Sequence, residues 1–310
     1  MKIIEHGDMS KYTSFRAGGT CKRLAIPENK EELLKLMNQL SKDNEEFVVI
    51  GNGTNVLFLD GEYPGTVIHI GDAFDYIDVE ATDIPGEDGA GNPVQMIRIK
   101  CGAGALLSRF AKAAMQNSAA GSEFCAGIPG SVGGAVFMNA GAYGGAIKDI
   151  LEHVILLIPP TTPGGEWEEK VVPVKELDLS YRHSRLQETK EIVVEATFLM
   201  EKGNPVWIEA VIEELTKRRV SMQPLEYPSA GSFFKRPPGY FAGKLIEDAG
   251  LKGMTVGGAQ ISDKHSGFMI NKGGATAQDI IDLMHLVQNT VKEKFDVQLE
   301  PEIRIIGLEE

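Results

Sequence analysis

Apolar residues recur at helical spacing in four segments of the chain, which predicts four helices. The first helix follows Pro27, and its apolar positions are Leu33, Leu34, Met37 and Leu40. The second covers residues 106–115, which are rich in alanine. The third opens at Pro205 and closes on a basic run that suits the negative end of a helix dipole. The fourth opens near Thr276, whose spacing to Asp279 resembles a capping box.

Strand-like runs of apolar residues lie between these helices. A strand, a Gly/Asn turn and a second short strand are expected within residues 45–60. Further runs cover residues 63–71, 95–104, 153–159, 169–174, 191–200 and 297–307. Residues 80–93 are acidic and rich in glycine and proline, so we expect a solvated loop there. The mixture predicts an α+β fold without an internal repeat, and a Gly–Asn–Pro turn near residue 205 favours a domain boundary.

Composition and charge exclude several classes of protein. The chain has 310 residues, of which 43% are hydrophobic and 24% charged, so it is expected to be globular with two or three domains. The net charge of −13 argues against a nucleic-acid partner. No apolar run is long enough to cross a membrane, and the charged N-terminal segment differs from a signal peptide. We therefore expect a cytoplasmic protein without a membrane partner.

The cysteines and histidines give no sign of a metal site. The three cysteines are widely spaced, and the six histidines form no H-E-x-x-H motif. An odd number of separated cysteines suits a reducing compartment. We expect the protein to hold no metal.

Glycine is in excess, and its clustering is informative. Two glycine pairs follow predicted strands, but a G-x-G-x-x-G fingerprint would need glycine where Val56 and Leu107 stand, and no P-loop motif exists. Each pair is explained equally well as a tight turn. Residues 127–145 contain seven glycines in 19 positions, whose N–H groups could cradle a pyrophosphate. Close packing of loops is the structural alternative, so this segment favours a dinucleotide site outside the Rossmann type.

Eight motifs stand in one order along nearly the whole chain. They are TSFRAGGTC at 13–21, GNGTNVL at 51–57, AGIPGSVGGAVFMNAGAYG at 126–144, SYRHSR at 180–185, PSAGSFFKRP at 228–237, AGKLIEDAGLKG at 242–253, HSGFMINKGGATAQD at 265–279 and LEPEIRIIG at 299–307. With these motifs the chain resembles the UDP-N-acetylenolpyruvoylglucosamine reductase family. It is similar to the subclass that lacks an extra substrate-covering tyrosine loop.

The resemblance implies both a fold and a reaction. Two subdomains, residues 1–75 and 76–205, are expected to bind FAD in the manner of vanillyl-alcohol-oxidase-like flavoproteins. Residues 206–298 are expected to form a substrate-binding α+β subdomain, and the last strand, within 299–310, is expected to rejoin residues 76–205. In such a reductase NADPH reduces FAD, and the flavin then reduces the enolpyruvyl ether of a UDP-sugar. The product is UDP-N-acetylmuramate, a peptidoglycan precursor.

The resemblance also implies three catalytic residues. Ser232 is the expected proton donor, and Arg182 is expected to pair with the substrate carboxylate. Glu302, rather than Glu300, matches the family position for an acid at the enolate oxygen, where its pKa should be raised. Each residue alone has an ordinary structural explanation, as a turn serine, a surface arginine or a solvated glutamate. Their joint occurrence in ordered motifs favours the catalytic interpretation.

The family motifs also carry the expected binding residues. Those for FAD are Gly51, Asn52, Gly53, Thr54, Asn55, Ile128, Pro129, Gly130, Ser131, Val132, Gly134, Asn139 and Gly141. Because these motifs contain no histidine or cysteine, the flavin is expected to be non-covalent. Those for the UDP-sugar are Tyr181, Lys235 and Arg236. Weaker candidates are Arg16 near the cofactor and Lys244 and Gln260 near the substrate. His265 and His285 are interpreted as structural.

Two other functions remain open from the sequence. One is an oxygen-using FAD oxidase of another small substrate on the same scaffold. The other is a nucleotide-binding regulatory module without redox chemistry. Residues 80–93 and 159–169 look like lineage-specific insertions, which leave the catalytic motifs intact.

Overall fold

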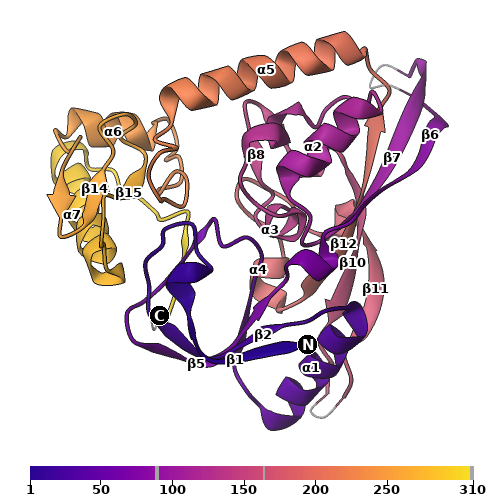
Figure 1. Cartoon of the computed structure of the whole chain (residues 1–310). Helices are drawn as coiled ribbons and strands as arrows, with labels where there is room; N and C mark the ends of the chain where they lie inside the picture. The colour runs from indigo at the N-terminus through magenta and orange to yellow at the C-terminus, as the bar shows by residue number, and fades with distance from the viewer. Residues whose placement is uncertain (88–90, 163–164, 308–310) are drawn as a thin grey trace. The chain divides into compact units, whose positions relative to one another are not determined.

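The computed structural model describes residues 1–87, 91–162 and 165–307 (Figure 1). The chain forms two compact units. Unit 1 consists of Met1–Ile3, Ala25–Asn52 and Val67–Arg218, and unit 2 consists of Ile4–Leu24, Gly53–Thr66 and Arg219–Glu310. The expected division into three subdomains stays a prediction. Within the described residues, no helix is both long and apolar enough to cross a membrane.

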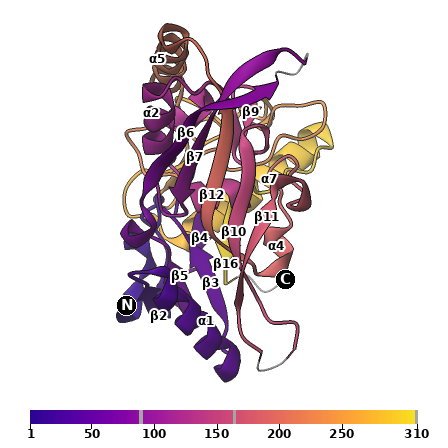
Figure 2. The ribbon, with the colours of Figure 1, turned by 90° about the vertical axis from the view of Figure 1, so that its right-hand side faces the viewer.

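Unit 1 is built around an antiparallel sheet with the strand order β11-β10-β12-β7-β6, whose strands run side by side in Figure 2. The strands are β6 (Ile77–Glu87), β7 (Pro93–Gly102), β10 (Leu151–Ile158), β11 (Glu168–Pro173) and β12 (Ile192–Glu201). Helices α2 (Leu107–Gln116), α3 (Val132–Phe137) and α4 (Leu186–Thr189) complete this part. Phe110 of α2 packs against Phe198 of β12, with ring centroids 4.2 Å apart.

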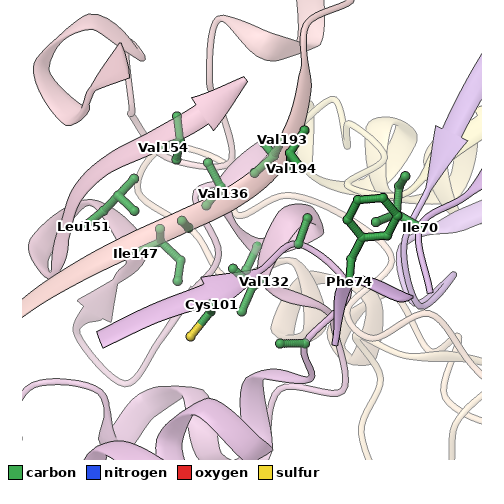
Figure 3. Close-up of a cluster of buried hydrophobic side chains, with 14 of the residues drawn as sticks. Ile70, Phe74, Cys101, Val132, Val136, Ile147, Leu151, Val154, Val193 and Val194 are labelled. Carbon is green, nitrogen blue, oxygen red and sulfur yellow. The ribbon is translucent and has the colours of Figure 1, made fainter. Parts of the chain in front are cut away.

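The core of unit 1 joins the glycine-rich segment to this sheet. Val132 and Val136 of α3 are fully buried among Cys101 of β7 and Val193 and Val194 of β12 (Figure 3). Since each apolar side chain removed from water contributes about 1.5–3 kcal/mol, this packing fixes the position of the segment. Burial also raises the pKa of the Cys101 thiol, so the sulfur stays neutral.

Helix α1 (Lys30–Asp43) lies in unit 1 and confirms the first predicted helix. Asn29 caps it by accepting from the N–H of Glu32, and the predicted apolar residues Leu33, Met37 and Leu40 are buried. Trp167, at the end of the second apparent insertion, donates its indole N–H to the Ser41 hydroxyl at 2.7 Å. The described end of that insertion is therefore anchored on α1. Residues 163–164 lie outside the described residues.

The first apparent insertion is a correction to the sequence analysis. Residues 80–87 were expected in a solvated loop, but they belong to β6, which pairs with β7 from Ile77↔Cys101 to Glu87↔Pro93. Among the described residues, β6 is the last strand of its sheet, so one of its edges has no partner strand there and tolerates acidic residues. Glu80 forms an ion pair with Lys100 of β7 at 2.6 Å. Residues 88–90 lie outside the described residues.

Unit 2 contains an antiparallel sheet of β13 (Thr255–Val256), β14 (Ala259–Ile261) and β15 (Met269–Asn271). Helices α6 (Ala242–Asp248) and α7 (Ala277–Phe295) pack with it (Figure 1). The predicted capping box is confirmed, because Thr276 accepts from the N–H of Asp279 while the Asp279 carboxylate accepts from the N–H of Thr276. The predicted apolar stripe of α7 is buried, including Ile280, Leu283 and Val287.

The last strand has a different partner from the one expected. β16 (Arg304–Ile306) pairs in parallel with β4 (Val56–Phe58), with Ile305 opposite Leu57. The expectation that it joins residues 76–205 is therefore wrong, because its hydrogen bonds go to the strand that follows the GNGTN turn. Both strands belong to unit 2.

The remaining elements complete the fold. A further sheet has the order β1-β2-β5-β3, with β1 (Lys2–Asp8), β2 (Thr20–Ile26), β3 (Phe47–Ile50) and β5 (Glu62–His69). A short hairpin joins β8 (Gly141–Ala142) to β9 (Gly145–Ala146). Helix α5 (Pro205–Met222) confirms the helix predicted from Pro205, but of its predicted apolar stripe only Ile208 is buried.

Candidate active site

The first part of the candidate site lies in unit 1, where two glycine-containing motifs meet. Gly51 follows β3, and the side-chain amide of Asn52 donates to the Pro129 carbonyl at 2.6 Å. A Cβ built on Gly51 would lie only 2.1 Å from the Ser131 hydroxyl oxygen. Glycine is therefore needed at position 51 to let the two motifs approach.

Ser131 carries an unusual buried polar group. It is 2% exposed, and its hydroxyl has no hydrogen-bond partner among the described residues. A buried hydroxyl without a partner costs about 1–3 kcal/mol, so native proteins rarely keep one without a purpose. A polar ligand atom beside Gly51 and Ser131 would remove that cost. The residues present thus fit the oxygen-rich portion of a dinucleotide.

The second glycine pair has a structural role. A Cβ on Gly102 would lie 2.1 Å from the carbonyl oxygen of Phe74, and one on Gly104 would lie 2.2 Å from that of Gly71. These glycines allow backbone segments to pack closely. The tight turn weighed for this pair is also present, because the N–H of Ala105 donates to the Gly102 carbonyl at 3.0 Å. The cysteine nearest the cofactor motif, Cys125, is fully buried, and burial raises the pKa of its thiol.

Arg182 lies in unit 1 at a tight turn. Ser180 and His183 exchange both backbone hydrogen bonds at 3.2 Å, which leaves Tyr181 and Arg182 at the tip. Arg182 has a left-handed backbone with φ of 56°, and its guanidinium carbon is 5.3 Å from the centroid of the Tyr181 ring. Tyr181 is 58% exposed and Arg182 is half-buried. Tyr181 and Arg182, both candidates for substrate contacts, therefore lie side by side at the tip of this turn.

The structure brings Ser232 and Glu302 together within unit 2. The N–H of Glu302 donates to the Phe233 carbonyl at 2.8 Å, and the N–H of Lys235 donates to the Glu300 carbonyl at 2.8 Å. Phe234 and Pro301 form an antiparallel bridge between these bonds. The segments that carry Ser232 and Glu302 therefore run side by side, although they are separated by about 70 positions in the printed sequence.

The second half of the GNGTN motif is bonded to the same strand. Asn55 donates its side-chain N–H to the Glu302 carbonyl at 3.1 Å, and its own carbonyl accepts from the N–H of Arg304 at 3.0 Å. Gly53 has a φ of 63°, and a Cβ there would lie 1.9 Å from the Tyr12 carbonyl. A candidate cofactor motif and a candidate acid are thus positioned by shared backbone hydrogen bonds.

The two cationic residues predicted to bind the substrate, Lys235 and Arg236, follow Ser232 in unit 2. Lys235 forms a half-exposed ion pair with Glu300 at 3.6 Å. The Arg236 guanidinium lies 3.8 Å from the Phe241 ring centroid, and its Nε donates to the Tyr240 carbonyl at 3.2 Å. Stacking uses the face of the guanidinium and leaves its N–H groups directed outward in the plane.

The weaker candidates have clear local partners. Gln260 donates to the Gly253 carbonyl and the Thr255 hydroxyl, while its own carbonyl oxygen is buried without a partner among the described residues. Lys244 forms an ion pair with Asp248, which raises the pKa of Lys244. His265 accepts from the N–H of Gly267 at 3.1 Å, so its structural interpretation agrees with its contacts.

The sequence analysis missed Asn271, which organises the loop around Arg16. Its side-chain amide is buried and donates to the carbonyls of Phe15 and Arg16, while its oxygen accepts from the N–H groups of Gly273 and Ala275. Arg16 has a φ of 52°. The Asn–Lys–Gly–Gly sequence signals a turn, but its contact with residues 15–16 is not readable locally.

No cluster of histidine, cysteine or acidic side chains able to hold a metal is found in residues 1–87, 91–162 and 165–307. Unit 1 carries the buried Ser131 hydroxyl and the Arg182 guanidinium. Unit 2 carries a serine and a glutamate on adjacent segments, followed by the Arg236 guanidinium. Such groups can bind a polyanionic cofactor or substrate and donate a proton.

Comparisons with known proteins give a consistent result. A family model for the C-terminal domain of UDP-N-acetylenolpyruvoylglucosamine reductase matches residues 223–306, and an FAD-binding-domain model matches residues 21–169. The reductase of Caldanaerobacter subterraneus is 44% identical over 306 residues, covering 99% of this chain and 94% of the relative. That of Clostridium perfringens is 45% identical over 305 residues, covering 98% and 93%.

A solved structure extends the similarity to the whole fold. The crystal structure of UDP-N-acetylenolpyruvylglucosamine reductase from Thermus caldophilus superposes with a TM-score of 0.77 at 32% identity. The match covers 98% of each chain.

Proposed function

The chain belongs to the UDP-N-acetylenolpyruvoylglucosamine reductase family, and from this membership we propose that it reduces the enolpyruvyl ether of UDP-N-acetylglucosamine to UDP-N-acetylmuramate. It is a flavin-dependent oxidoreductase that uses FAD, and NADPH is the proposed electron source. The observation that carries the proposal is the set of hydrogen bonds, from the backbone and from the Asn55 side chain, that joins the segments of Ser232, Glu302 and the Gly53–Asn55 motif. We propose that the reaction takes place in the cytoplasm, as a step of peptidoglycan precursor synthesis.

FAD, when bound, supplies the two-electron relay between the nicotinamide donor and the substrate double bond. The residues proposed to hold it are Gly51, Asn52, Gly53, Thr54, Asn55, Ile128, Pro129, Gly130, Ser131, Val132, Gly134, Asn139 and Gly141. Ser131 supports this assignment, because its buried hydroxyl lacks a partner in the described part of the chain and lies where Gly51 leaves room. We propose that the cofactor is held without a covalent bond, since none of these residues is a histidine or cysteine.

Ser232 is proposed to donate the proton that completes the reduction. Adding a hydride equivalent to one alkene carbon leaves negative charge on the other carbon and on the attached carboxylate. A serine hydroxyl is a weak acid, so it must be held against a strongly basic carbon. The bridge to Phe268 and the bond from the Phe233 N–H to the Gly267 carbonyl at 2.9 Å fix the backbone of Ser232.

Glu302 and Arg182 are proposed to stabilise the negative charge. A protonated Glu302 would donate a hydrogen bond to the enolate oxygen, which requires a raised pKa. Arg182 would pair its planar guanidinium with the substrate carboxylate. Both groups act more strongly on the transition state than on the bound substrate, because the carboxylate gains further negative charge as the double bond is reduced, and this difference is the condition for acceleration.

The UDP portion is proposed to bind Tyr181, Lys235 and Arg236. A diphosphate favours cations, and a uracil ring favours an exposed aromatic face. We also propose that the chain keeps the family's subdomains at residues 1–75, 76–205 and 206–298.

An anaerobic half-reaction experiment tests this function. The purified protein is reduced with NADPH without oxygen, and the flavin absorbance is followed after adding UDP-N-acetylglucosamine enolpyruvate. We expect the substrate to restore the oxidised flavin spectrum. If the substrate leaves the flavin reduced while oxygen rapidly oxidises it, the oxidase alternative is favoured instead. A protein that stays colourless after incubation with FAD would support the regulatory alternative.

A further inference from the structure

The side chain of Asn139 is bonded on both of its polar ends to the protein. Its amide N–H donates to the Ser180 carbonyl at 2.7 Å, and its carbonyl oxygen accepts from the N–H of Lys148 at 3.0 Å. Asn139 is 3% exposed and has a left-handed backbone with φ of 41°. Asparagine tolerates this conformation better than most residues. The residue assigned above to the cofactor motif thus uses its side chain to hold another loop.

That loop is the turn that presents Arg182. Ser180 and His183 close the turn through their backbone bonds, so the carbonyl held by Asn139 belongs to its first residue. Arg182 itself has a strained φ of 56°, which costs about 1–2 kcal/mol for a residue with a side chain. Such a conformation persists only where its surroundings fix it.

Two further bonds brace the turn against the same segment. The Ser184 hydroxyl donates to the Phe137 carbonyl at 2.6 Å. Gln187 donates from its side-chain amide to the carbonyls of Phe137 at 3.2 Å and Arg182 at 3.1 Å. All these residues belong to unit 1. The turn is therefore connected at several points to residues 137–139.

We propose that Asn139 is a positioning residue for Arg182, and that the pair recognises the carboxylate of the substrate and product. This assignment rests on the proposed function, in which Arg182 pairs with the substrate carboxylate. It adds Asn139 as the residue that orients Arg182. A displacement of about 1 Å in a catalytic group can cost about 100-fold in rate, so the support of the turn has functional weight. Asn139 acts through Arg182 and needs no contact with the ligand.

The test compares two ligands that differ by a lactyl ether, which carries the carboxylate. UDP-N-acetylmuramate carries the carboxylate of the lactyl ether, whereas UDP-N-acetylglucosamine lacks it. Dissociation constants are measured by calorimetry on the flavin-loaded protein, together with its flavin content. Asn139→Asp keeps the acceptor for the Lys148 N–H and tolerates the same φ, but places a carboxylate oxygen against the Ser180 carbonyl.

We expect Asn139→Asp to weaken UDP-N-acetylmuramate binding about tenfold, as for the loss of one good hydrogen bond. Because both polar ends of the Asn139 side chain are bonded to the protein, any contact of Asn139 with FAD is expected through its backbone. Binding of UDP-N-acetylglucosamine and the flavin content should therefore stay unchanged. In an Arg182→Ala background the same change should cause no further loss, because the residue that it positions is gone. Gln187→Glu, which also loses its donors to the turn, should act in the same direction and serves if Asn139→Asp fails to fold.

Asn117→Asp is the matched control, since Asn117 also donates from its side chain to a backbone carbonyl, that of Ala113 at 2.9 Å. It should leave the affinities for both ligands unchanged. Equal loss of both ligands in Asn139→Asp, or loss of flavin with intact product binding, would overturn the assignment. If the unchanged protein binds both nucleotides equally well, the proposed function itself fails.

Discussion

Gly53 provides a sharp test of the loop that joins the cofactor motif to the Glu302 strand. A Cβ at this position would lie 1.9 Å from the Tyr12 carbonyl oxygen, and the backbone φ is 63°. The neighbouring loop also depends on the bond from the Ser14 N–H to the Gly53 carbonyl at 2.9 Å. Gly53→Ala therefore combines a steric clash with an unfavourable backbone conformation.

The expected loss of unfolding free energy in Gly53→Ala has two parts. An L-residue in the left-handed region costs about 1–2 kcal/mol, and losing the adjacent hydrogen bond adds about 0.5–1.5 kcal/mol. Gly274→Ala is the matched control, because Gly274 has a φ of 66° and no atom within 4 Å of the added Cβ. We expect unfolding free energies lowered by about 1.5–3.5 kcal/mol for Gly53→Ala and about 1–2 kcal/mol for Gly274→Ala.

The assay has two readouts. Urea unfolding of the apoprotein gives the stability difference, and quenching of flavin fluorescence gives the FAD dissociation constant. Gly53→Ala should raise that constant about tenfold or more, whereas Gly274→Ala should leave it unchanged. Equal effects of the two variants on both readouts would refute the close approach of Tyr12 to Gly53.

Three further predictions concern Ser131, Glu302 and His265. Ser131→Ala should change apoprotein stability by less than about 1 kcal/mol while weakening FAD binding about tenfold, since its hydroxyl has no partner in residues 1–87, 91–162 and 165–307. Destabilisation with normal FAD affinity would indicate that the hydroxyl stabilises the protein and does not bind FAD. Glu302→Gln should retain FAD in the absorption spectrum but lower kcat, and loss of the flavin would make Glu302 structural. Burial lowers the pKa of His265, so the unfolded chain binds this proton more readily, and unfolding free energy should fall as pH drops below about 6.5. His265→Asn should reduce that slope in urea titrations at pH 7 and pH 5, and an unchanged slope would contradict the assignment.

Local sequence patterns predicted the longer helices α1, α2, α5 and α7 because the forces that form them are local, but gave no sign of the shorter α3, α4 and α6. Asn29 caps α1, and Thr276 with Asp279 caps α7, at positions next to the apolar stripes that those helices bury. The pattern misled at β6, whose glycine, proline and acidic residues indicate a loop. They are tolerated in a strand because, within the part of the chain that the structure describes, that strand has a partner on one side only.

Long-range pairing could not be inferred from local patterns. The partner of β16 is β4, at residues 56–58, far from β16 in the printed sequence. A short apolar run does not encode which strand it joins. Asn139 shows the same limit in the site, because its place among glycines suggested the cofactor while its side chain is bonded to Ser180. The family motifs identified Ser232 and Glu302, and the backbone pairing supplied the reason that the two segments adjoin.

The central claim is that Ser232 supplies the proton on a segment fixed beside Glu302. Its most direct test is a single-turnover experiment on Ser232→Ala without oxygen, in which the two flavin half-reactions are timed separately. We expect the rate of flavin reduction by NADPH to remain near that of the unchanged protein. The rate of flavin reoxidation by the enolpyruvyl substrate should fall about 10²–10⁴-fold. Equal slowing of both half-reactions, or reoxidation at the normal rate, would contradict the claim.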